Sequence, residues 1–176
     1  MERVAFLGAG SFGTALSILL AEKGNPINIW DRNENIIEEI NKNRSNEKYA
    51  KGIRLPESIT GFTKMEEAVA ECQYIVLAVP SHAIREISQR LKDIIPHNAI
   101  IISIAKGVEP KTNKRLSEVI REELTNPVVI LSGPSHAEEV MLKIPTTLVA
   151  TSLDMDYAKD VQDLFMDLKR HLYTSS

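Results

Sequence analysis

Residues 8–13 read Gly-Ala-Gly-Ser-Phe-Gly and directly follow the apolar run Val4–Leu7. The segment after them, Thr14–Lys23, is predicted to be helical, and the next apolar run, Ile27–Trp30, is followed by Asp31. The order is therefore strand, glycine turn, helix, strand and acidic residue. This pattern constrains the fold more than any other in the chain, because it is the arrangement that binds a dinucleotide.

Each residue type in this pattern has a geometric reason. Gly8 lets the chain turn tightly out of the strand, Gly10 lets the backbone approach a pyrophosphate, and Gly13 lets the helix pack against the sheet. The free N–H groups and the dipole of the helix start then face the phosphates. Asp31 lies 18 residues after Gly13, close to the spacing of about 20 for the acid that binds the ribose. The alternative is a structural turn without a ligand.

The composition is that of a globular domain with a substantial core. The chain has 176 residues, of which 43% are hydrophobic and 26% are charged, so we expect one domain. Its net charge of −3 favours neither a nucleic acid nor a membrane as partner. The single cysteine, Cys72, cannot form an internal disulfide, which is typical of the reducing cytoplasm. We expect it to be a packed side chain, and we find no spacing of histidine and cysteine that would bind a metal.

Apolar runs and helical periodicity alternate throughout the chain. The uncharged stretch Val4–Ala21 imitates a signal peptide, but its glycines and hydroxyl groups favour a strand followed by a buried helix. We predict strands, several of them continuous Val/Ile/Leu runs typical of a parallel sheet, at Arg3–Leu7, Ile27–Asp31, Tyr74–Val79, Ala99–Ile104, Pro127–Leu131 and Thr146–Thr151, with a short one near Ile59–Thr63. We predict helices at Thr14–Lys23, Glu34–Asn43, Met65–Glu71, His82–Ile95, Lys114–Leu124, Ala137–Lys143 and Met155–Arg170. The predicted fold class is α/β, a Rossmann-like, doubly wound and mostly parallel sheet with helices on both faces.

In such sheets ligands bind beyond the carboxyl ends of the strands, so the residues just after each strand matter most. Asp31 suits the ribose of NAD and Arg32 suits the 2′-phosphate of NADP, and the pair leaves the choice of cofactor open. Lys106 directs an ammonium at the ligand crevice from the end of a strand, unless it is an ordinary surface lysine.

A second turn between a strand and a helix lies at residues 133–136. Ser135 is expected to cap the helix or to touch a substrate oxygen, and capping is the commoner role. His136 has no evident acidic partner in the sequence, so a structural or exposed histidine is favoured over an acid or base. The same holds for His82, which is expected in the first turn of a helix.

Together these residues resemble the N-terminal domain of bacterial NAD(P)-dependent glycerol-3-phosphate dehydrogenases. The resemblance covers essentially the whole chain. It rests on four motifs, of which the last is the most specific: Gly8-Ala9-Gly10-Ser11-Phe12-Gly13-Thr14-Ala15, Ala78-Val79-Pro80-Ser81, Lys106-Gly107 and Gly133-Pro134-Ser135-His136-Ala137-Glu138-Glu139.

The resemblance implies roles for individual positions. Cofactor contacts are implied for Ser11, Phe12, Arg32, Tyr49, Lys106 and Ala137, in addition to Gly8, Gly10, Gly13 and Asp31. Contacts with glycerol 3-phosphate are implied for Lys106, Gly133 and Ser135. The implied reaction is reversible hydride transfer between NAD(P)H and dihydroxyacetone phosphate, which supplies a precursor of phospholipids.

The chain departs from the family in two respects. Relatives often carry Tyr-Leu-Pro-Gly where this chain has Tyr49-Ala50-Lys51-Gly52, so the shape of the loop-like segment 44–57 is open. The family also has a helical domain that contributes the general acid/base lysine. We therefore expect residues 1–176 to be the NAD(P)-binding domain alone, without a catalytic residue of its own and inactive in isolation.

Two other functions stay open at this stage. One is a related dehydrogenase that acts on another hydroxy acid or ketone, and the other is a dinucleotide-binding regulatory module without catalysis. The expected partner is the small phosphorylated substrate, the expected location is the cytoplasm, and a homodimer is left open.

Overall fold

Strands and helices alternate along the chain in the computed structural model, which describes residues 1–134, 136–166 and 171–175. The strands are β1 (Val4–Leu7), β2 (Ile27–Trp30), β3 (Ile59–Phe62), β4 (Tyr74–Leu77), β5 (Ile100–Ser103), β6 (Val128–Ser132), β7 (Thr147–Thr151) and β8 (His171–Ser175). The helices are α1 (Ser11–Glu22), α2 (Glu34–Asn43), α3 (Met65–Val69), α4 (Ile84–Leu91), α5 (Leu116–Glu123), α6 (Ala137–Met141) and α7 (Met155–Phe165), with a 3₁₀ turn η1 (Ser81–Ala83). The predicted α/β class is confirmed.

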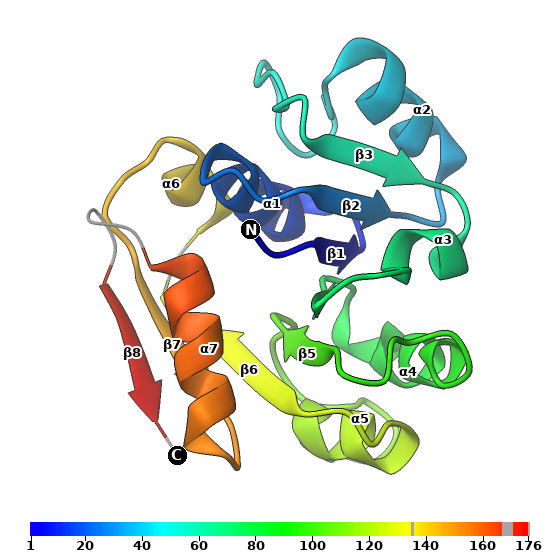
Figure 1. Ribbon diagram of the computed structural model, residues 1–176, viewed down its shortest axis with the longest axis vertical. Helices are drawn as coiled ribbons and strands as arrows, with labels where there is room; N and C mark the ends of the chain where they lie inside the picture. The colour runs from blue at the N-terminus through cyan, green and yellow to red at the C-terminus, as the bar shows by residue number, and fades with distance from the viewer. Residues whose placement is uncertain (135, 167–170, 176) are drawn as a thin grey trace.

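The described strands form one eight-stranded sheet in the order β3-β2-β1-β4-β5-β6-β7-β8. Neighbouring strands run parallel except for β6 and β7, which are antiparallel. In the centre β1 pairs with β2 on one side and β4 on the other, so that Val4 lies opposite both Ile27 and Tyr74. The strand order reverses between β1 and β4 (Figure 1), and ligands bind at the carboxyl ends of the strands at such a reversal.

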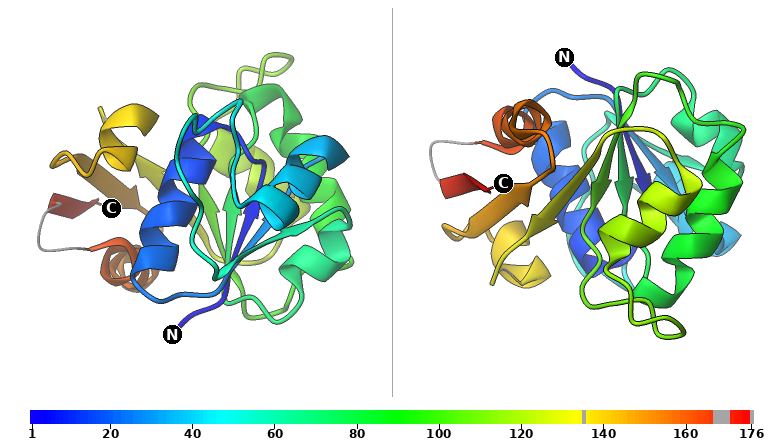
Figure 2. Two further views of the ribbon diagram at one scale, coloured as in Figure 1. Left: turned by 90° about the horizontal axis from the view of Figure 1, so that it is seen from above. Right: turned by 90° about the horizontal axis from the view of Figure 1, so that it is seen from below.

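Helices cover both faces of the sheet, as predicted (Figure 2). Successive side chains of a strand point to opposite faces, so Val4 and Phe6 belong to one buried cluster and Ala5 and Leu7 to another. The first cluster contains residues of α1, α2, α6 and α7, and the second contains residues of α3, α4 and α5. The sheet is therefore buried on both sides, which explains the continuous apolar runs.

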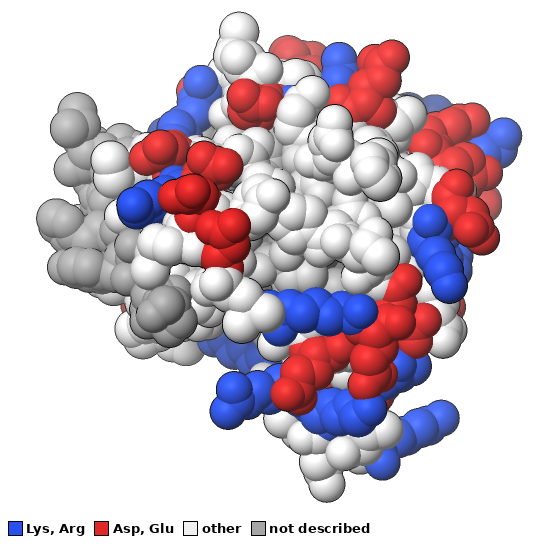
Figure 3. Space-filling view, turned by 60° about the horizontal axis from the view of Figure 1, so that its bottom comes forward, with Lys and Arg blue, Asp and Glu red and all other residues white. Residues whose placement is uncertain are grey.

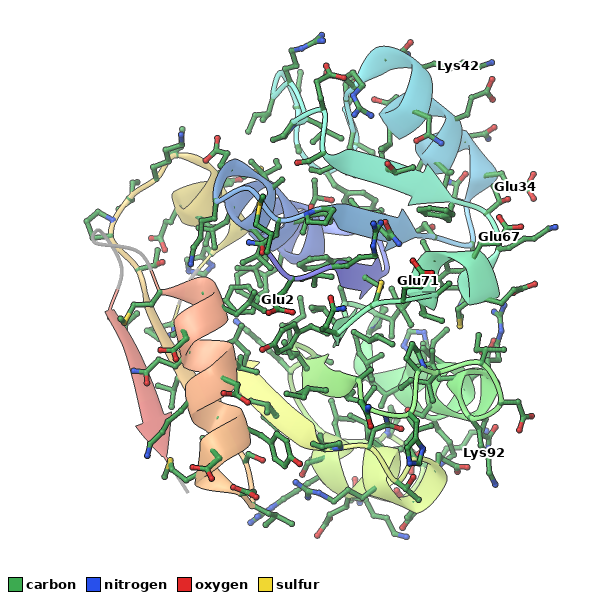
Figure 4. The ribbon with its side chains drawn as sticks, in the orientation of Figure 1. Glu2, Glu34, Lys42, Glu67, Glu71 and Lys92 are labelled. Atoms are coloured by element: carbon green, nitrogen blue, oxygen red, sulfur yellow. The ribbon has the colours of Figure 1, made fainter. Side chains whose placement is uncertain are left out.

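Helix α2 shows how local sequence sets the ends of an element. The side chain of Asn33 accepts a hydrogen bond from the N–H of Asn35 and caps the helix start, and Arg44 stops the helix at a left-handed φ of 53°. Its buried isoleucines face the sheet, whereas Glu34 and Lys42 near its two ends point away from the molecule (Figure 4). The predicted bounds Glu34–Asn43 are confirmed.

Several other predicted helices have different ends in the structure. Helix α1 begins at Ser11, before the predicted Thr14, because part of the glycine turn is itself the first turn of the helix. The segment predicted as one helix, His82–Ile95, is the 3₁₀ turn η1 followed by α4, which ends at Leu91. Pro96 follows closely and disfavours helical backbone at the residue before it. Positive φ values of Glu71 (59°) and Lys143 (58°) end α3 and α6 early.

The prediction was also wrong at the C-terminal end. Helix α7 stops at Phe165 and Met166 is extended, with φ −64° and ψ 130°, while the predicted last residue, Arg170, lies outside the described residues. Strand β8, which pairs in parallel with β7, was not predicted. Five residues at an edge carry too little periodicity to be recognised without the neighbouring strand.

Candidate functional site

A cleft of about 600 Å³ opens at the carboxyl ends of the central strands. The end of β1 contributes the glycine turn, the end of β2 contributes Asp31 and Arg32, and the ends of β4 and β5 contribute Ala78 and Ile104. The cleft is lined by Gly8, Gly10, Ser11, Phe12, Gly13, Asp31, Arg32, Asn33, Ile36, Lys48, Tyr49, Ala78, Val79, Pro80, His82, Ala83, Ile104 and Ala105. Eight residues predicted as cofactor contacts therefore meet in one place: Gly8, Gly10, Ser11, Phe12, Gly13, Asp31, Arg32 and Tyr49.

The glycine turn packs against the end of β4. Gly8 has φ +113°, and a Cβ atom there would lie 2.5 Å from the carbonyl oxygen of Ala78. A Cβ atom on Gly13 would lie 2.7 Å from the Cβ of Ala78, so neither position accommodates a side chain without movement. A Cβ atom on Gly10, in contrast, would meet nothing within 4 Å. Gly10 therefore borders open space, as backbone that approaches a ligand requires.

Ala9, in the middle of the turn, is held by side chains from three other segments. Its N–H donates to Oδ2 of Asp31 at 2.8 Å. Its carbonyl oxygen accepts from Nδ2 of Asn46 at 3.0 Å and from Oγ1 of Thr14 at 3.1 Å. Asn46 and Thr14 are fully buried and bond to each other at 3.1 Å. The shape of the turn is therefore fixed before any ligand binds.

The sequence analysis did not identify the role of Asn46. This asparagine lies in a segment that reads as a loop, where asparagine is common and most often solvent-exposed. Only the fold brings it beneath the turn, 37 residues away along the chain from Ala9.

Asp31 has a structural role that its spacing does not show. One carboxylate oxygen accepts from Ala9, and the other accepts from the N–H of Asn33 at 2.8 Å. A carboxylate has about four acceptor positions, so the half-buried side chain still offers lone pairs to a ribose in the cleft. The contact with ribose stays a prediction.

Two cations border the same cleft. The Arg32 side chain is exposed and makes no hydrogen bond or ion pair with the residues that the structure describes. The ammonium of Lys48 lies 5.0 Å from the centre of the Tyr49 ring, a cation–π distance. Sequence reasoning missed Lys48, whose only signal was its position beside Tyr49.

Lys106, predicted to contact the cofactor, is not among the residues that line the cleft. The two residues before it, Ile104 and Ala105, line the cleft, while Lys106 itself is exposed. His82, expected at a helix start, lies in η1 and also borders the cleft.

The motif at residues 133–137 lies beside a neighbouring hollow of about 630 Å³. Ala137 and His136 line this hollow, which shares Ser11, Lys48 and Tyr49 with the cleft. Gly133 has a packing role, since a Cβ atom there would lie 2.4 Å from the carbonyl oxygen of Thr147 in β7. Ser135 lies outside the described residues, so neither of its predicted roles is tested.

The geometry can now be compared with known proteins. The sequence profile of the family described as "NAD-dependent glycerol-3-phosphate dehydrogenase N-terminus" matches residues 3–158. The chain belongs to this dehydrogenase family. Family membership and the cleft together confirm the predicted dinucleotide-binding, Rossmann-like domain.

Relatives of this dehydrogenase domain are similar over nearly its full length. A protein of Clostridium botulinum (strain Alaska E43 / Type E3) named glycerol-3-phosphate dehydrogenase [NAD(P)+] is 55% identical over 99% of the chain and 53% of its own length. One of Clostridium perfringens (strain SM101 / Type A) with the same name is 56% identical, again over 53% of its length. The chain thus spans about half the length of these relatives.

A solved structure shows the same fold. The crystal structure of glycerol-3-phosphate dehydrogenase from Coxiella burnetii superposes with a TM-score of 0.94 and is 30% identical, covering 99% of this chain and 54% of its own. The dehydrogenase domain thus has the family's architecture as well as its sequence motifs.

Three further observations concern the chemistry of this dehydrogenase domain. Cys72 is buried and free, so the predicted packed side chain is confirmed, and burial raises the pKa of its thiol to about 11, which disfavours the reactive thiolate. Within the described part of the chain, no group of three or more His, Cys, Asp and Glu side chains is arranged to hold a metal. No described helix has the length and apolar character needed to cross a membrane.

Proposed function

We propose that this chain is the cofactor-binding part of an enzyme that interconverts dihydroxyacetone phosphate and sn-glycerol 3-phosphate. The observation that carries the proposal is the cleft of about 600 Å³ around the glycine turn, in a chain 55% identical to a protein named for this activity. The product is a building block of phospholipids. The family motif at Gly133–Ala137 favours this substrate over another hydroxy acid or ketone.

The residues of the cleft fit a dinucleotide. Gly10 caps α1 without a side chain and makes no side-chain hydrogen bond to the first turn. The N–H groups at the helix start therefore remain directed at the cleft, where they favour phosphate oxygens. NAD(P)H, when bound, supplies the hydride for C2 of the substrate.

The remaining residues bind and orient. Asp31 accepts hydrogen bonds from the ribose, Arg32 neutralises a 2′-phosphate, and Tyr49 and Phe12 provide apolar contact with the cofactor. Lys106 contacts the cofactor and the substrate phosphate or carbonyl. Gly133 and Ser135 contact the substrate, and Ala137, which lines the neighbouring hollow, contacts the cofactor.

Reduction of the ketone also requires a proton for the alkoxide oxygen that forms at C2. Lys48 and Lys106 are the lysines nearest the cleft, and both are proposed to bind rather than to transfer a proton. Because the relatives are almost twice as long, we propose that residues 1–176 form the NAD(P)-binding domain and turn over slowly by themselves. Rapid reduction of dihydroxyacetone phosphate by these residues alone would contradict this.

A titration of the chain with NADH tests the cofactor site. Trp30 is the only tryptophan and immediately precedes Asp31 at the cleft, so its fluorescence should be quenched by bound NADH. Gly10→Val should weaken binding by about tenfold or more, corresponding to at least 1.4 kcal/mol, because its side chain fills the open space without a clash in the fold. The smaller Gly10→Ala should weaken it less. If the wild-type chain binds neither NADH nor NADPH, the proposed cofactor site is wrong and the glycine turn is a structural turn without a ligand.

We further propose that the protein acts in the cytoplasm. The free and buried Cys72 supports a reducing compartment. We also propose a homodimer, and sedimentation of the purified chain tests this directly.

A further inference from the structure

A partly buried ion pair lies next to the cleft but outside its lining. The guanidinium of Arg85 in α4 donates to both carboxylate oxygens of Glu109, from Nε at 2.6 Å and from Nη2 at 2.9 Å. The hydroxyl of Thr112 donates to the same carboxylate. The Glu109 side chain is only 9% exposed. This bidentate geometry is the strong form of an arginine–carboxylate pair.

The two partners belong to the two segments that border one end of the cleft. Arg85 is the second residue of α4, which follows η1, and His82 and Ala83 of η1 line the cleft. Glu109 lies four residues after Ala105, which also lines the cleft. The ion pair therefore joins the segment after β4 to the segment after β5.

The side chain of Lys106 is not held by an ion pair of this kind with any described residue. It makes no hydrogen bond or ion pair with the part of the chain that the structure describes, and the next residues, Gly107 and Val108, are exposed. Beyond them residues 109–114 form a hydrogen-bonded turn, in which the N–H of Glu109 donates to the carbonyl oxygen of Lys114 at 3.0 Å. Glu109 is thus the first buried side chain after Lys106 along the chain.

We propose that Arg85 and Glu109 are positioning residues that hold Lys106 beside the cleft. This inference rests on the proposed function, since it assumes that Lys106 contacts the cofactor. The pair acts through the backbone of residues 106–109 and touches no ligand itself.

The surrounding charges make the proposal testable without unfolding the protein. Arg85 also pairs with Glu122 at 2.9 Å and with Glu123 at 2.8 Å, both in α5. Acidic and basic side chains interleave over the lower part of Figure 3, on the side where Figure 1 places α4 and α5. Loss of one carboxylate therefore leaves Arg85 paired, which avoids the cost of an uncompensated charge.

The decisive comparison is Glu109→Gln against Glu123→Gln in this chain. In both variants an amide of the same size takes the place of a carboxylate that pairs with Arg85. Only Glu109, however, lies in the same segment as Lys106. We expect Glu109→Gln to weaken NADH binding by about fivefold and Glu123→Gln by less than about twofold. Equal effects of the two substitutions, or no effect of Glu109→Gln, would overturn the proposal. Thermal unfolding of each variant shows whether it is folded at the temperature of the titration.

A double-mutant cycle with Lys106→Met separates positioning from general loosening. If Glu109 acts through Lys106, Glu109→Gln should change NADH binding by less than about twofold once Lys106 is methionine. The same loss in both backgrounds would show that Glu109 supports the fold only. If Lys106→Met by itself leaves NADH binding unchanged, the proposed role of Lys106 fails. If Lys106→Met weakens binding and Glu109→Gln does not, only the positioning role fails.

Discussion

At Ala9 the shape of the dinucleotide turn depends on three side chains, two of which lie far along the chain. Asp31 holds the N–H, and Asn46 and Thr14 hold the carbonyl oxygen. A turn fixed in this way need not be ordered by the cofactor, and ordering a loop is one of the costs that weaken binding. Asn46 and Thr14 therefore shape the site although, unlike Asp31, they do not line the cleft.

Replacement of the buried Asn46 tests this arrangement. Asn46→Ala removes two hydrogen bonds from a fully buried network, so we expect the free energy of unfolding to fall by about 2 kcal/mol. The matched control is Asn98→Ala, because Asn98 is exposed. This substitution should change the free energy of unfolding by less than about 0.5 kcal/mol. Urea unfolding measures both. Similar losses for the two variants would mean that the network is unimportant.

Arg32 is the residue with which to test the choice of cofactor. Its side chain is exposed beside Asp31 at the cleft, so a 2′-phosphate can reach it. Arg32→Ala should weaken NADPH by about tenfold or more and NADH by about twofold or less, since a charge-assisted hydrogen bond contributes about 1.5–3 kcal/mol. Parallel titrations of each variant with NADPH and NADH give the ratio of the two losses of affinity. Equal losses would exclude a 2′-phosphate contact.

Among the elements, α7 is joined to α1 by one long side chain. The ammonium of Lys23, just after α1, donates to the carbonyl oxygens of Leu164 and Met166, each at 2.7 Å. These carbonyls lie at the C-terminal end of α7, where a cation is favoured by the free acceptors and by the helix dipole. This contact was not predictable from α1 alone, because its partners lie more than 140 residues away.

Loss of the Lys23 ammonium should destabilise the end of α7. We expect Lys23→Met to lower the free energy of unfolding by about 1 kcal/mol and to speed amide exchange in the last turn of α7. Lys159→Met, on the exposed side of the same helix, is the control and should do neither. Hydrogen exchange that is unchanged in both variants would show that other contacts hold this end.

The ion pair between Arg85 in α4 and Glu109 after β5 makes the stability of the fold depend on pH. Hydrogen bonds from Arg85 and Thr112 lower the pKa of Glu109 from 4.5 to about 2. A carboxyl group whose pKa is lowered on folding stabilises the protein above its unfolded pKa, and this stabilisation is lost as the pH falls toward the folded pKa. The difference in unfolding midpoint between wild type and Glu109→Gln should therefore be constant near neutral pH and shrink between pH 4.5 and about 2. A constant difference across that range would contradict the assignment.

At the scale of the whole molecule, two buried clusters share a single sheet. Side chains of β1 reach both clusters, so the loss of either layer of helices exposes one face of the same strands on which the other layer packs. We therefore expect one cooperative unfolding transition.

Ligand binding should raise the stability of this single unit. At a concentration 100 times its dissociation constant, NADH should add about 2.7 kcal/mol to the free energy of unfolding. The expected result is one transition that moves to higher temperature with NADH in wild type, and by less in Gly10→Val at the same NADH concentration. Differential scanning calorimetry would reveal two transitions if the layers unfold separately.

Much of this organisation was predictable from local sequence. The glycine pattern, the apolar runs and the helical periodicity indicated the sheet, its class and, together with the family resemblance, eight predicted cofactor contacts that line the cleft. They did so because backbone geometry and burial impose short periods that a single segment displays by itself. The ends of helices were less predictable, since left-handed residues such as Glu71 and Lys143 carry no strong local signal.

The sequence by itself determined that a strand, a glycine turn and a helix would form a dinucleotide site, because these features depend on neighbouring residues. Only the tertiary structure decided that Asn46 locks the turn, that Gly133 is required by packing against β7, and that Arg85 and Glu109 join the two segments beside the cleft. Each of these is a contact between segments far apart in the chain. Their partners are set by the order of the strands, and no local pattern encodes that order.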